Sequence, residues 1–377
     1  MQVRHQRTPT VGAVRSHLTV DLAPQAQSAI GAMQADWAAL QADAKASPYM
    51  TFNWLESWAT VYRPSRLRAV RIEDPSGGLV AIGLLEELPL RRLRFAGAPV
   101  TPIRGLLCRD GYELAAWRAL GEWLSDRSDW AWMDARGIGI DASGLPGAVM
   151  TVEPWLAIEL PGSFDEYLSG RPPARRGEMR RRLRIAEREG LATTTARQAE
   201  VRAALESFVR LHRERALAKH ELHSAIDNRL AEMLTRVAQQ TVPVLTVVSL
   251  TRAGETLAVA VNVNHAGESW GYNTGFATDA AHFSPGLIVC LAAIRDAIDG
   301  GAHRFDLGPG DSKFKLELGG ERCDRQRIEI GSRSPIALGW RTASLSRRRL
   351  RQVPWVRSAL GTLRSVRARS SFARTPS

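Results

Sequence analysis

The order of the hydrophobic patterns constrains the fold of this chain more than any other feature of its sequence. In the second half, apolar residues first recur at helical spacing and then alternate as they do in strands. The patterns predict, in order, helices over 200–217 and 225–239, strands over 242–250, 256–264 and 269–275, a helix over 284–298, and strands over 303–307 and 325–330. We expect this order to fold as an α/β unit in which helices cover a sheet.

The first half carries a shorter version of the same order. Its patterns predict helices over 28–41 and from Asn53, with Asn53 as N-cap, then strands over 67–72, 79–87 and 90–96, a helix over 112–124 and a strand over 130–135. We therefore predict two related α/β domains, at residues 21–150 and 151–331, although no clear sequence repeat is visible. A loose arm over 1–20 and a tail over 332–377 are expected to flank them.

The positive charge of the chain lies almost entirely at one end. The formal net charge is +12, from 51 Lys and Arg against 39 Asp and Glu. Residues 331–377 contain eleven Arg and no Lys, Asp or Glu, so residues 1–330 hold 40 basic against 39 acidic side chains. A nearly neutral body argues against a dedicated nucleic-acid-binding fold. The tail interleaves Trp and Leu with Arg, which suits either an anionic membrane surface or a solvated, unfolded segment.

The cysteines and the hydropathy indicate the cellular compartment. Cys108, Cys290 and Cys323 are far apart and lack metal-ligand spacing, so we expect neither a disulfide framework nor a metal site. The N-terminal residues have no apolar core of signal-peptide length, and no run of 18 uncharged apolar residues occurs. We therefore expect a cytoplasmic protein whose tail could associate peripherally with the inner face of the membrane.

The stretch from Tyr272 to Lys315 carries the most informative motif string. It holds a strand with Tyr272 and Gly275, a helix start at Ser284, Pro285 and Gly286, and then Asp306, Gly310, Phe314 and Lys315. This string resembles the C-terminal half of the bacterial GNAT-like, Fem-related acyltransferases, in the CelD-type subgroup associated with cellulose and exopolysaccharide synthesis. Two weaker matches are a Trp-rich segment over 52–58 and an Arg-rich segment over 175–190. The resemblance covers roughly residues 45–330.

The resemblance implies a fold and an activity. The fold class is α/β (α+β), as tandem GNAT-like domains that each contain a mixed, mostly antiparallel sheet flanked by helices. The activity is N-acyl transfer from acetyl-CoA or another acyl-CoA to an amine or amino sugar, directly through a tetrahedral intermediate. The acceptor would be a small molecule or a glycan precursor of envelope or exopolysaccharide synthesis.

Two alternative functions stay open. GNAT enzymes usually bind the CoA pyrophosphate with an Arg/Gln-x-x-Gly-x-Gly/Ala loop, whereas residues 279–286 here read Asp-Ala-Ala-His-Phe-Ser-Pro-Gly. The missing loop favours aminoacyl-tRNA as donor, as in the Fem branch that builds peptidoglycan cross-bridges. The tail favours a non-catalytic subunit that anchors or regulates a polysaccharide machine at the membrane surface.

Lys315, Asp306 and Tyr272 are the predicted catalytic residues. The chain has only four Lys, and two of them follow the Gly-rich turn over 308–310. There the compact ammonium of Lys315 would stabilise charge on the tetrahedral intermediate or on a phosphate. Asp306 would orient Lys315 or act as general base, or else only close a turn. Tyr272 would contact the acyl carbonyl or leaving group, or else pack in the core.

Five residues are predicted to bind the donor: Ser284, Gly286, Lys313, Arg180 and Arg184. A helix that starts at Ser284 presents free N–H groups to a phosphate, and Gly286 allows a close approach. Eight Arg lie between Arg171 and Arg188, and they form either a phosphate-binding face or a solvated one.

Overall fold

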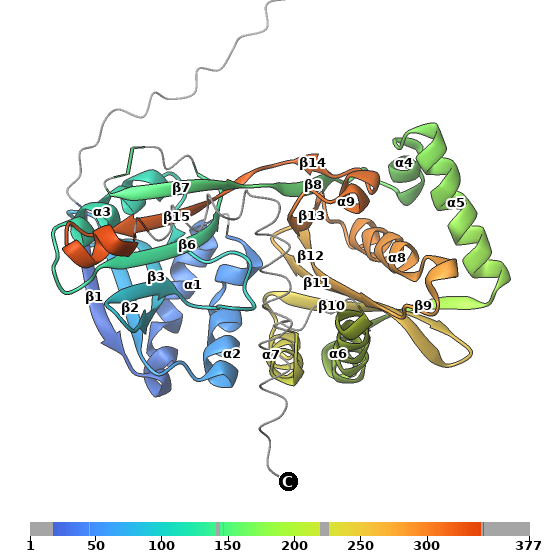
Figure 1. The fold of residues 1–377 in the computed structure, drawn as a ribbon, viewed down its shortest axis with the longest axis horizontal. Coiled ribbons are helices and arrows are strands. Elements are labelled where there is room, and N and C mark those ends of the chain that lie inside the picture. The colour runs from blue at the N-terminus through green and yellow to red at the C-terminus, as the bar shows by residue number, and fades with distance from the viewer. Residues whose placement is uncertain are drawn as a thin grey trace, which may run out of the picture.

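The protein is built on two β-sheets that lie side by side (Figure 1). The computed structural model describes residues 18–342 apart from 45, 141–143, 146, 219–225 and 341. Most of the predicted N-terminal arm, and the Arg-rich tail beyond residue 342, lie outside the described residues. Within the described part, no helix combines the length and apolar character needed to cross a membrane.

The first sheet holds strands from both ends of the described chain. Its strands in spatial order are β1 (Thr19–Gln25), β2 (Leu67–Glu73), β3 (Leu79–Leu88), β4 (Arg92–Phe95), β6 (Trp132–Ile138), β15 (Arg325–Gly331) and β7 (Ala148–Glu153), and β5 (Leu107–Cys108) pairs with β3. All described pairings in it are antiparallel except that of β4 with β6.

The second sheet has seven strands. In spatial order they are β14 (Glu321–Arg322), β8 (Trp155–Glu159), β13 (Arg304–Pro309), β12 (Glu268–Phe276), β11 (Glu255–His265), β10 (Val244–Arg252) and β9 (Leu191–Arg197). The predicted meander is confirmed as β10, β11 and β12, which pair antiparallel in chain order. β13 joins β12 in parallel because the helix α8 (Pro285–Asp299) carries the chain back across the sheet.

The chain crosses between the sheets twice, which the sequence did not reveal. β7 in the first sheet continues past Pro154 directly into β8 in the second, and β14 leads back into β15 (Figure 1). The predicted domain limits at residues 150 and 331 therefore do not follow the sheets, since β7 and β15 both complete the first one. β1 also begins at Thr19, inside the segment predicted as a loose arm.

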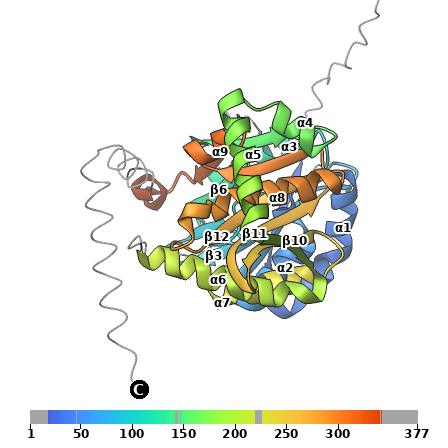
Figure 2. The same cartoon turned by 90° about the vertical axis from the view of Figure 1, so that its right-hand side faces the viewer.

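Helices cover both sheets. They are η1 (Gln27–Met33), α1 (Gln34–Asp43), η2 (Pro48–Met50), α2 (Phe52–Tyr62), α3 (Glu113–Ser125), α4 (Phe164–Ser169), α5 (Pro173–Arg188), η3 (Gln198–Glu200), α6 (Val201–Ala218), α7 (Asn228–Ala238), η4 (Ala281–Phe283), α8 and α9 (Lys313–Glu317). α6 packs on one face of the second sheet and α8 on the other, with α5 beside α8 (Figure 2). Because α2 packs against α7, one buried cluster includes residues of both halves.

The predicted N-cap of α2 is wrong by two residues. Thr51, not Asn53, caps this helix, and its hydroxyl accepts a hydrogen bond from the Trp54 N–H. Asn53 lies inside the helix and donates from its side chain to the carbonyl of Val242, at 2.7 Å. The local pattern assigned the Asn53 side chain to the cap, but this side chain instead bonds to a residue 189 positions away in the chain.

Candidate active site

The strands β12 and β13 pair with each other only over their first residues. They pair from Glu268↔Arg304 to Trp270↔Asp306, and no pairing follows although both strands continue. A cavity of about 880 Å³ lies where they diverge, between the sheet, α8, α9 and the first turns of α5. Backbone groups of the unpaired strand ends are left for a ligand in this cavity.

A bulge in β12 lies beside this divergence. Val261 of β11 pairs with Asn273, whereas the next residue, Asn262, pairs with Gly271, so Tyr272 is the extra residue. A bulged residue leaves the regular ladder and redirects its side chain. The Tyr272 hydroxyl donates to the Val100 carbonyl of the first half, at 2.8 Å. Burial raises the pKa of this phenol.

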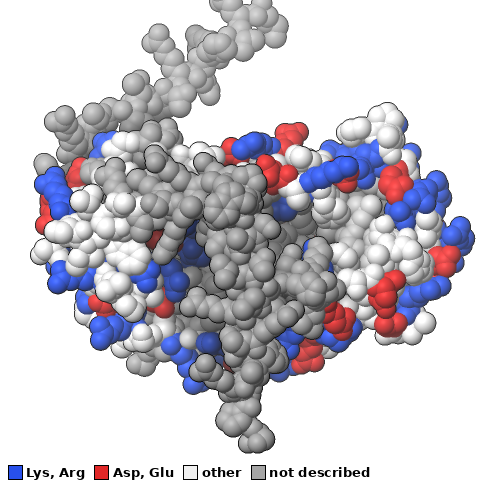
Figure 3. Space-filling view, in the orientation of Figure 1, with Lys and Arg blue, Asp and Glu red and all other residues white. Residues whose placement is uncertain are grey.

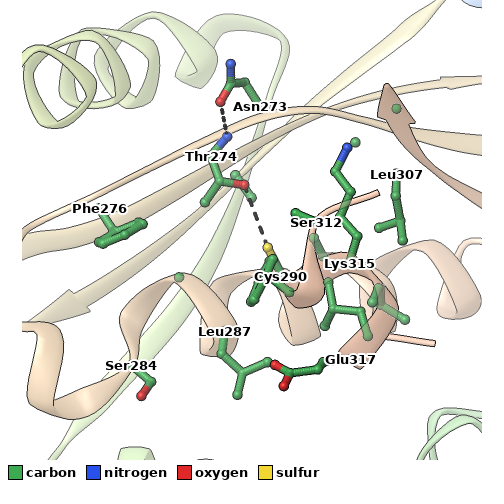
Figure 4. Close-up of a pocket in the computed structure, with 18 of the residues that line it drawn as sticks. Asn273, Thr274, Phe276, Ser284, Leu287, Cys290, Leu307, Ser312, Lys315 and Glu317 are labelled. Carbon is green, nitrogen blue, oxygen red and sulfur yellow. Dashed lines mark hydrogen bonds between the residues drawn. The ribbon is translucent and has the colours of Figure 1, made fainter. Parts of the chain in front are cut away.

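One end of the cavity is the N-terminus of α8. Ser284 occupies the N-cap position with φ 60° and Pro285 follows at the first helical position, as predicted, but the Ser284 side chain makes no capping hydrogen bond. Its hydroxyl is therefore free to face a ligand (Figure 4). Gly286 packs on Phe276, and a Cβ at this position would lie 3.2 Å from the ring. The helix start and its free N–H groups favour an anion here.

Lys315 lies at the other end of the cavity. Figure 4 shows its side chain across the cavity from Ser284, with Thr274 and Cys290 between them. The ammonium donates to the Pro309 carbonyl at 2.7 Å. Burial lowers the pKa of Lys315, and the charge of Asp306 opposes that shift.

Lys313 points away from the cavity, in contrast to Lys315. Its side chain is 90% exposed and pairs with Glu317 of the next turn at 3.9 Å. Lys313 does not line the cavity.

Asp306 is buried at the point where the two strands part, with 1% of its surface exposed. Its Oδ1 accepts from the Trp155 indole N–H at 2.6 Å and from the Gly308 N–H at 2.7 Å. Its Oδ2 lies 3.5 Å from the guanidinium of Arg325. Burial raises the pKa of this carboxyl, and Arg325 and both hydrogen bonds oppose that shift. Among the described residues no hydrogen bond or ion pair joins Asp306 to Lys315, whose ammonium donates to the Pro309 carbonyl.

The Arg-rich helix α5 reaches the cavity with its first turns. Arg180 and Arg184 are exposed and do not line the cavity. Arg175, Glu178 and Met179 line it instead, and Arg175 forms an ion pair with Glu317 of α9. Figure 3 shows basic side chains gathered along the edge of the molecule where α5 lies.

Sequence reasoning missed four residues that line the cavity: Arg215, Asn262, Thr274 and Cys290. The Arg215 guanidinium stacks on Phe276, 4.8 Å from the ring centroid, beside the start of α8. The Thr274 hydroxyl and the Cys290 sulfur are 3.7 Å apart. Burial raises the pKa of Cys290 to about 11, so the thiol stays protonated at neutral pH and is no nucleophile.

The described residues hold no group of three or more His, Cys, Asp or Glu side chains placed to bind a metal ion.

Comparison with known proteins assigns this region. Residues 173–316, which contribute α8, β13 and most of the cavity, match the family described as acetyltransferase (GNAT) domain. This stretch of the chain is therefore similar to a GNAT domain. Among curated proteins, none matches the sequence significantly.

Solved structures similar to the chain extend beyond the GNAT domain. The structure of FemX has a TM-score of 0.57 and 12% identity, and the match covers 82% of this chain and 96% of that chain. The C-terminal domain of a putative lysylphosphatidylglycerol synthetase from Agrobacterium fabrum has a TM-score of 0.51 and 13% identity. This match covers 85% of this chain and 97% of that chain. A conserved protein of unknown function from Bacteroides thetaiotaomicron has a TM-score of 0.52 and 11% identity. The match covers 83% of this chain and 100% of that chain.

These similarities confirm the predicted fold. The structure has two mixed sheets flanked by helices, and the match to the GNAT family lies over residues 173–316. At such low identity the solved structures speak for the fold alone. The GNAT domain supports an acyltransferase, while the CelD-type subgroup stays a prediction.

Proposed function

We propose that this protein is an N-acyltransferase that takes an acyl group from acyl-CoA and transfers it to an amine or amino sugar. The observation that carries the proposal is the cavity of the GNAT domain, which opens where β12 and β13 diverge. A helix N-terminus at one end and a half-buried lysine at the other give this cavity the two polar ends that a long thioester donor needs.

The phosphates of the donor bind at the start of α8. Ser284 offers an uncapped hydroxyl, and Gly286 allows close approach to the backbone. The Arg215 guanidinium is beside them, and its Nε has no hydrogen-bond partner among the described residues. These groups replace the Gly-rich pyrophosphate loop that the sequence lacks.

The reaction takes place at the Lys315 end. The nitrogen of the acceptor attacks the thioester carbonyl, and the tetrahedral intermediate collapses as the C–S bond breaks. The proton lost by the amine leaves with the thiol. The Lys315 ammonium stabilises the negative charge on the carbonyl oxygen, and its partial burial strengthens that interaction. Asp306, whose Oδ1 accepts two hydrogen bonds and whose Oδ2 lies 3.5 Å from Arg325, and Tyr272, whose hydroxyl donates to Val100, act as positioning residues.

A panel of acyl-CoAs with amine and amino-sugar acceptors tests the proposal, with release of free CoA thiol as readout. We expect Lys315→Ala to lower kcat by at least about a hundredfold, in the range seen when an oxyanion donor is removed. Arg322→Ala is the matched control, because this exposed cation pairs with Asp324 and does not line the cavity. Equal thiol release by Lys315→Ala and wild type, or no binding of any acyl-CoA in calorimetry, would remove the proposal.

Aminoacyl-tRNA is the second candidate donor. The exposed Arg180 and Arg184 on α5, outside the cavity, are the observation that favours it, since a polyanion needs basic surface beyond the active site. Filter binding with charged tRNA separates the two donors. Tight binding that Arg180→Ala with Arg184→Ala weakens, together with no CoA binding, would select the tRNA donor.

A further inference from the structure

Asn262 is a buried amide that faces the cavity without a partner. Only 3% of its surface is exposed, and it lines the cavity. Along β11, Val261 and Val263 point to the α6 side, so Asn262 between them points to the α8 side, where the cavity lies. Among the described residues its side chain makes no hydrogen bond, whereas Asn264, two positions on, donates to the Thr246 hydroxyl at 3.2 Å.

A glycine and an aromatic ring lie beside this amide. Asn262 pairs with Gly271, the residue next to the point where β12 and β13 part. A Cβ at Gly271 would lie 3.1 Å from the Phe305 ring. Ala260 and Ala293 also line the cavity, so small side chains and the ring of Phe305 share its lining with this amide.

The two ends of the cavity decide which part of a donor reaches Asn262. In an acyl-CoA the phosphates and the acyl group lie at opposite ends of the molecule. With the phosphates at Ser284, the acyl group extends toward Lys315 (Figure 4). Gly271, the pairing partner of Asn262, follows Trp270, at which the pairing of β12 with β13 ends. The acyl group is therefore the part that meets the amide.

We propose that Asn262 selects donors whose acyl group carries a hydroxyl, amino or amide group. This inference rests on the proposed function and adds the class of acyl group to it. A buried amide facing an apolar chain loses its hydrogen bonds to water, whereas a polar acyl group replaces them. A site built around such a bond discriminates against the analogue that lacks it.

The test uses the full chain and two thioesters of equal length, butyryl-CoA and 3-hydroxybutyryl-CoA. We expect wild type to prefer the hydroxyacyl donor by about tenfold or more in kcat/KM, which is the loss expected when one buried hydrogen bond is left unmade. Asn262→Leu, which has a similar volume, should reduce or reverse this ratio. Asn264→Leu is the matched control and should keep it, because that residue lies outside the cavity lining.

The possible results distinguish failure of the inference from failure of the proposed function. Turnover of both donors at equal kcat/KM by wild type overturns the inference and leaves the proposed function standing. The same holds if Asn262→Leu slows both donors by one factor, since the amide would then contact the part of CoA that they share. Turnover of no thioester removes the proposed function, and the inference with it. The wild-type ratio needs no variant, so a folding defect in Asn262→Leu leaves the test decisive.

Discussion

The buried carboxylate of Asp306 gives the sharpest test of how this site is held together. It accepts two hydrogen bonds, from Trp155 and Gly308, and lies 3.5 Å from Arg325 in an environment where almost none of its surface meets water. Arg325 itself is 18% exposed, and its guanidinium stacks between Trp155 and Trp270, 5.1 and 5.2 Å from their centroids. Removal of the carboxylate would leave this cation buried without its counter-charge.

The magnitude follows from these contacts. Breaking a buried ion pair by removal of one partner costs about 3–5 kcal/mol, because the other charge stays desolvated. For Asp306→Ala we expect a loss in this range, which already includes the two donors left unpaired. That loss is a large part of the roughly 5–15 kcal/mol by which a folded domain is stable. Asp306→Asn removes the same charge but keeps an acceptor for Trp155 and Gly308, so its loss should lie at the lower end of this range, about 3 kcal/mol.

Urea denaturation followed by tryptophan fluorescence measures these losses. The control is Asp324→Ala, which breaks an exposed ion pair with Arg322 at 2.7 Å and should cost less than about 1 kcal/mol. Thiol release by Asp306→Asn, corrected for the folded fraction, should stay within about tenfold of wild type, since this variant keeps the Gly308 turn. An Asp306→Asn protein of wild-type stability with activity lower by a thousandfold or more would refute this reasoning and make Asp306 the general base predicted from the sequence.

Three further predictions follow from the same geometry. The rate should fall at high pH with an apparent pKa below the usual value for lysine, because burial lowers the pKa of Lys315 and only the ammonium is active; Lys315→Arg should lose this alkaline limb. Tyr272→Phe should lower the free energy of unfolding by about 1–3 kcal/mol in urea denaturation and leave kcat unchanged, because its hydroxyl donates to the Val100 carbonyl. A loss of kcat at full stability would instead support its predicted catalytic role. Gly286→Val should raise KM for acyl-CoA more than it lowers kcat, because its side chain would press on Phe276 at the phosphate end; unchanged KM would place the phosphates elsewhere.

Local pattern predicted the elements of the second half well. The meander over 242–275, the helix that starts after Ser284 and the strand over 303–307 all appear in the structure. Each depends on short-range features, namely alternation of apolar residues, turn glycines and a proline at the first helical position. The same features brought Ser284, Gly286 and Lys315 together at one cavity.

The partners of the site residues depend on contacts between distant parts of the chain, which no local sequence pattern contains. The sequence suggested that Asp306 orients Lys315. In the structure its Oδ1 accepts a hydrogen bond from Trp155, which is 151 residues away in the chain. The hydroxyl of Tyr272 is bound by a carbonyl 172 residues away. Asn262 did leave a signal that was overlooked, since it is a lone amide in the apolar run over 257–263 and faces the interior with its neighbour Ala260. The Arg-rich helix held too many similar residues for the sequence to show that Arg175, and not Arg180, reaches the cavity.

The return of the chain through β15 links the two sheets to the cavity. Arg325, the first residue of β15, pairs with Glu153 of β7 in the first sheet, while its guanidinium lies beside Trp155, Trp270 and Asp306 of the second. Asp306 in turn accepts from the Gly308 N–H and so fixes the turn at which β13 leaves β12. A shift of one sheet against the other therefore has to move Arg325, and with it the carboxylate that shapes the reacting end of the cavity. Because of this connection, the second half alone, cut before β15, would lose the counter-ion of its most buried charge, and the first sheet is part of the active site without lining it.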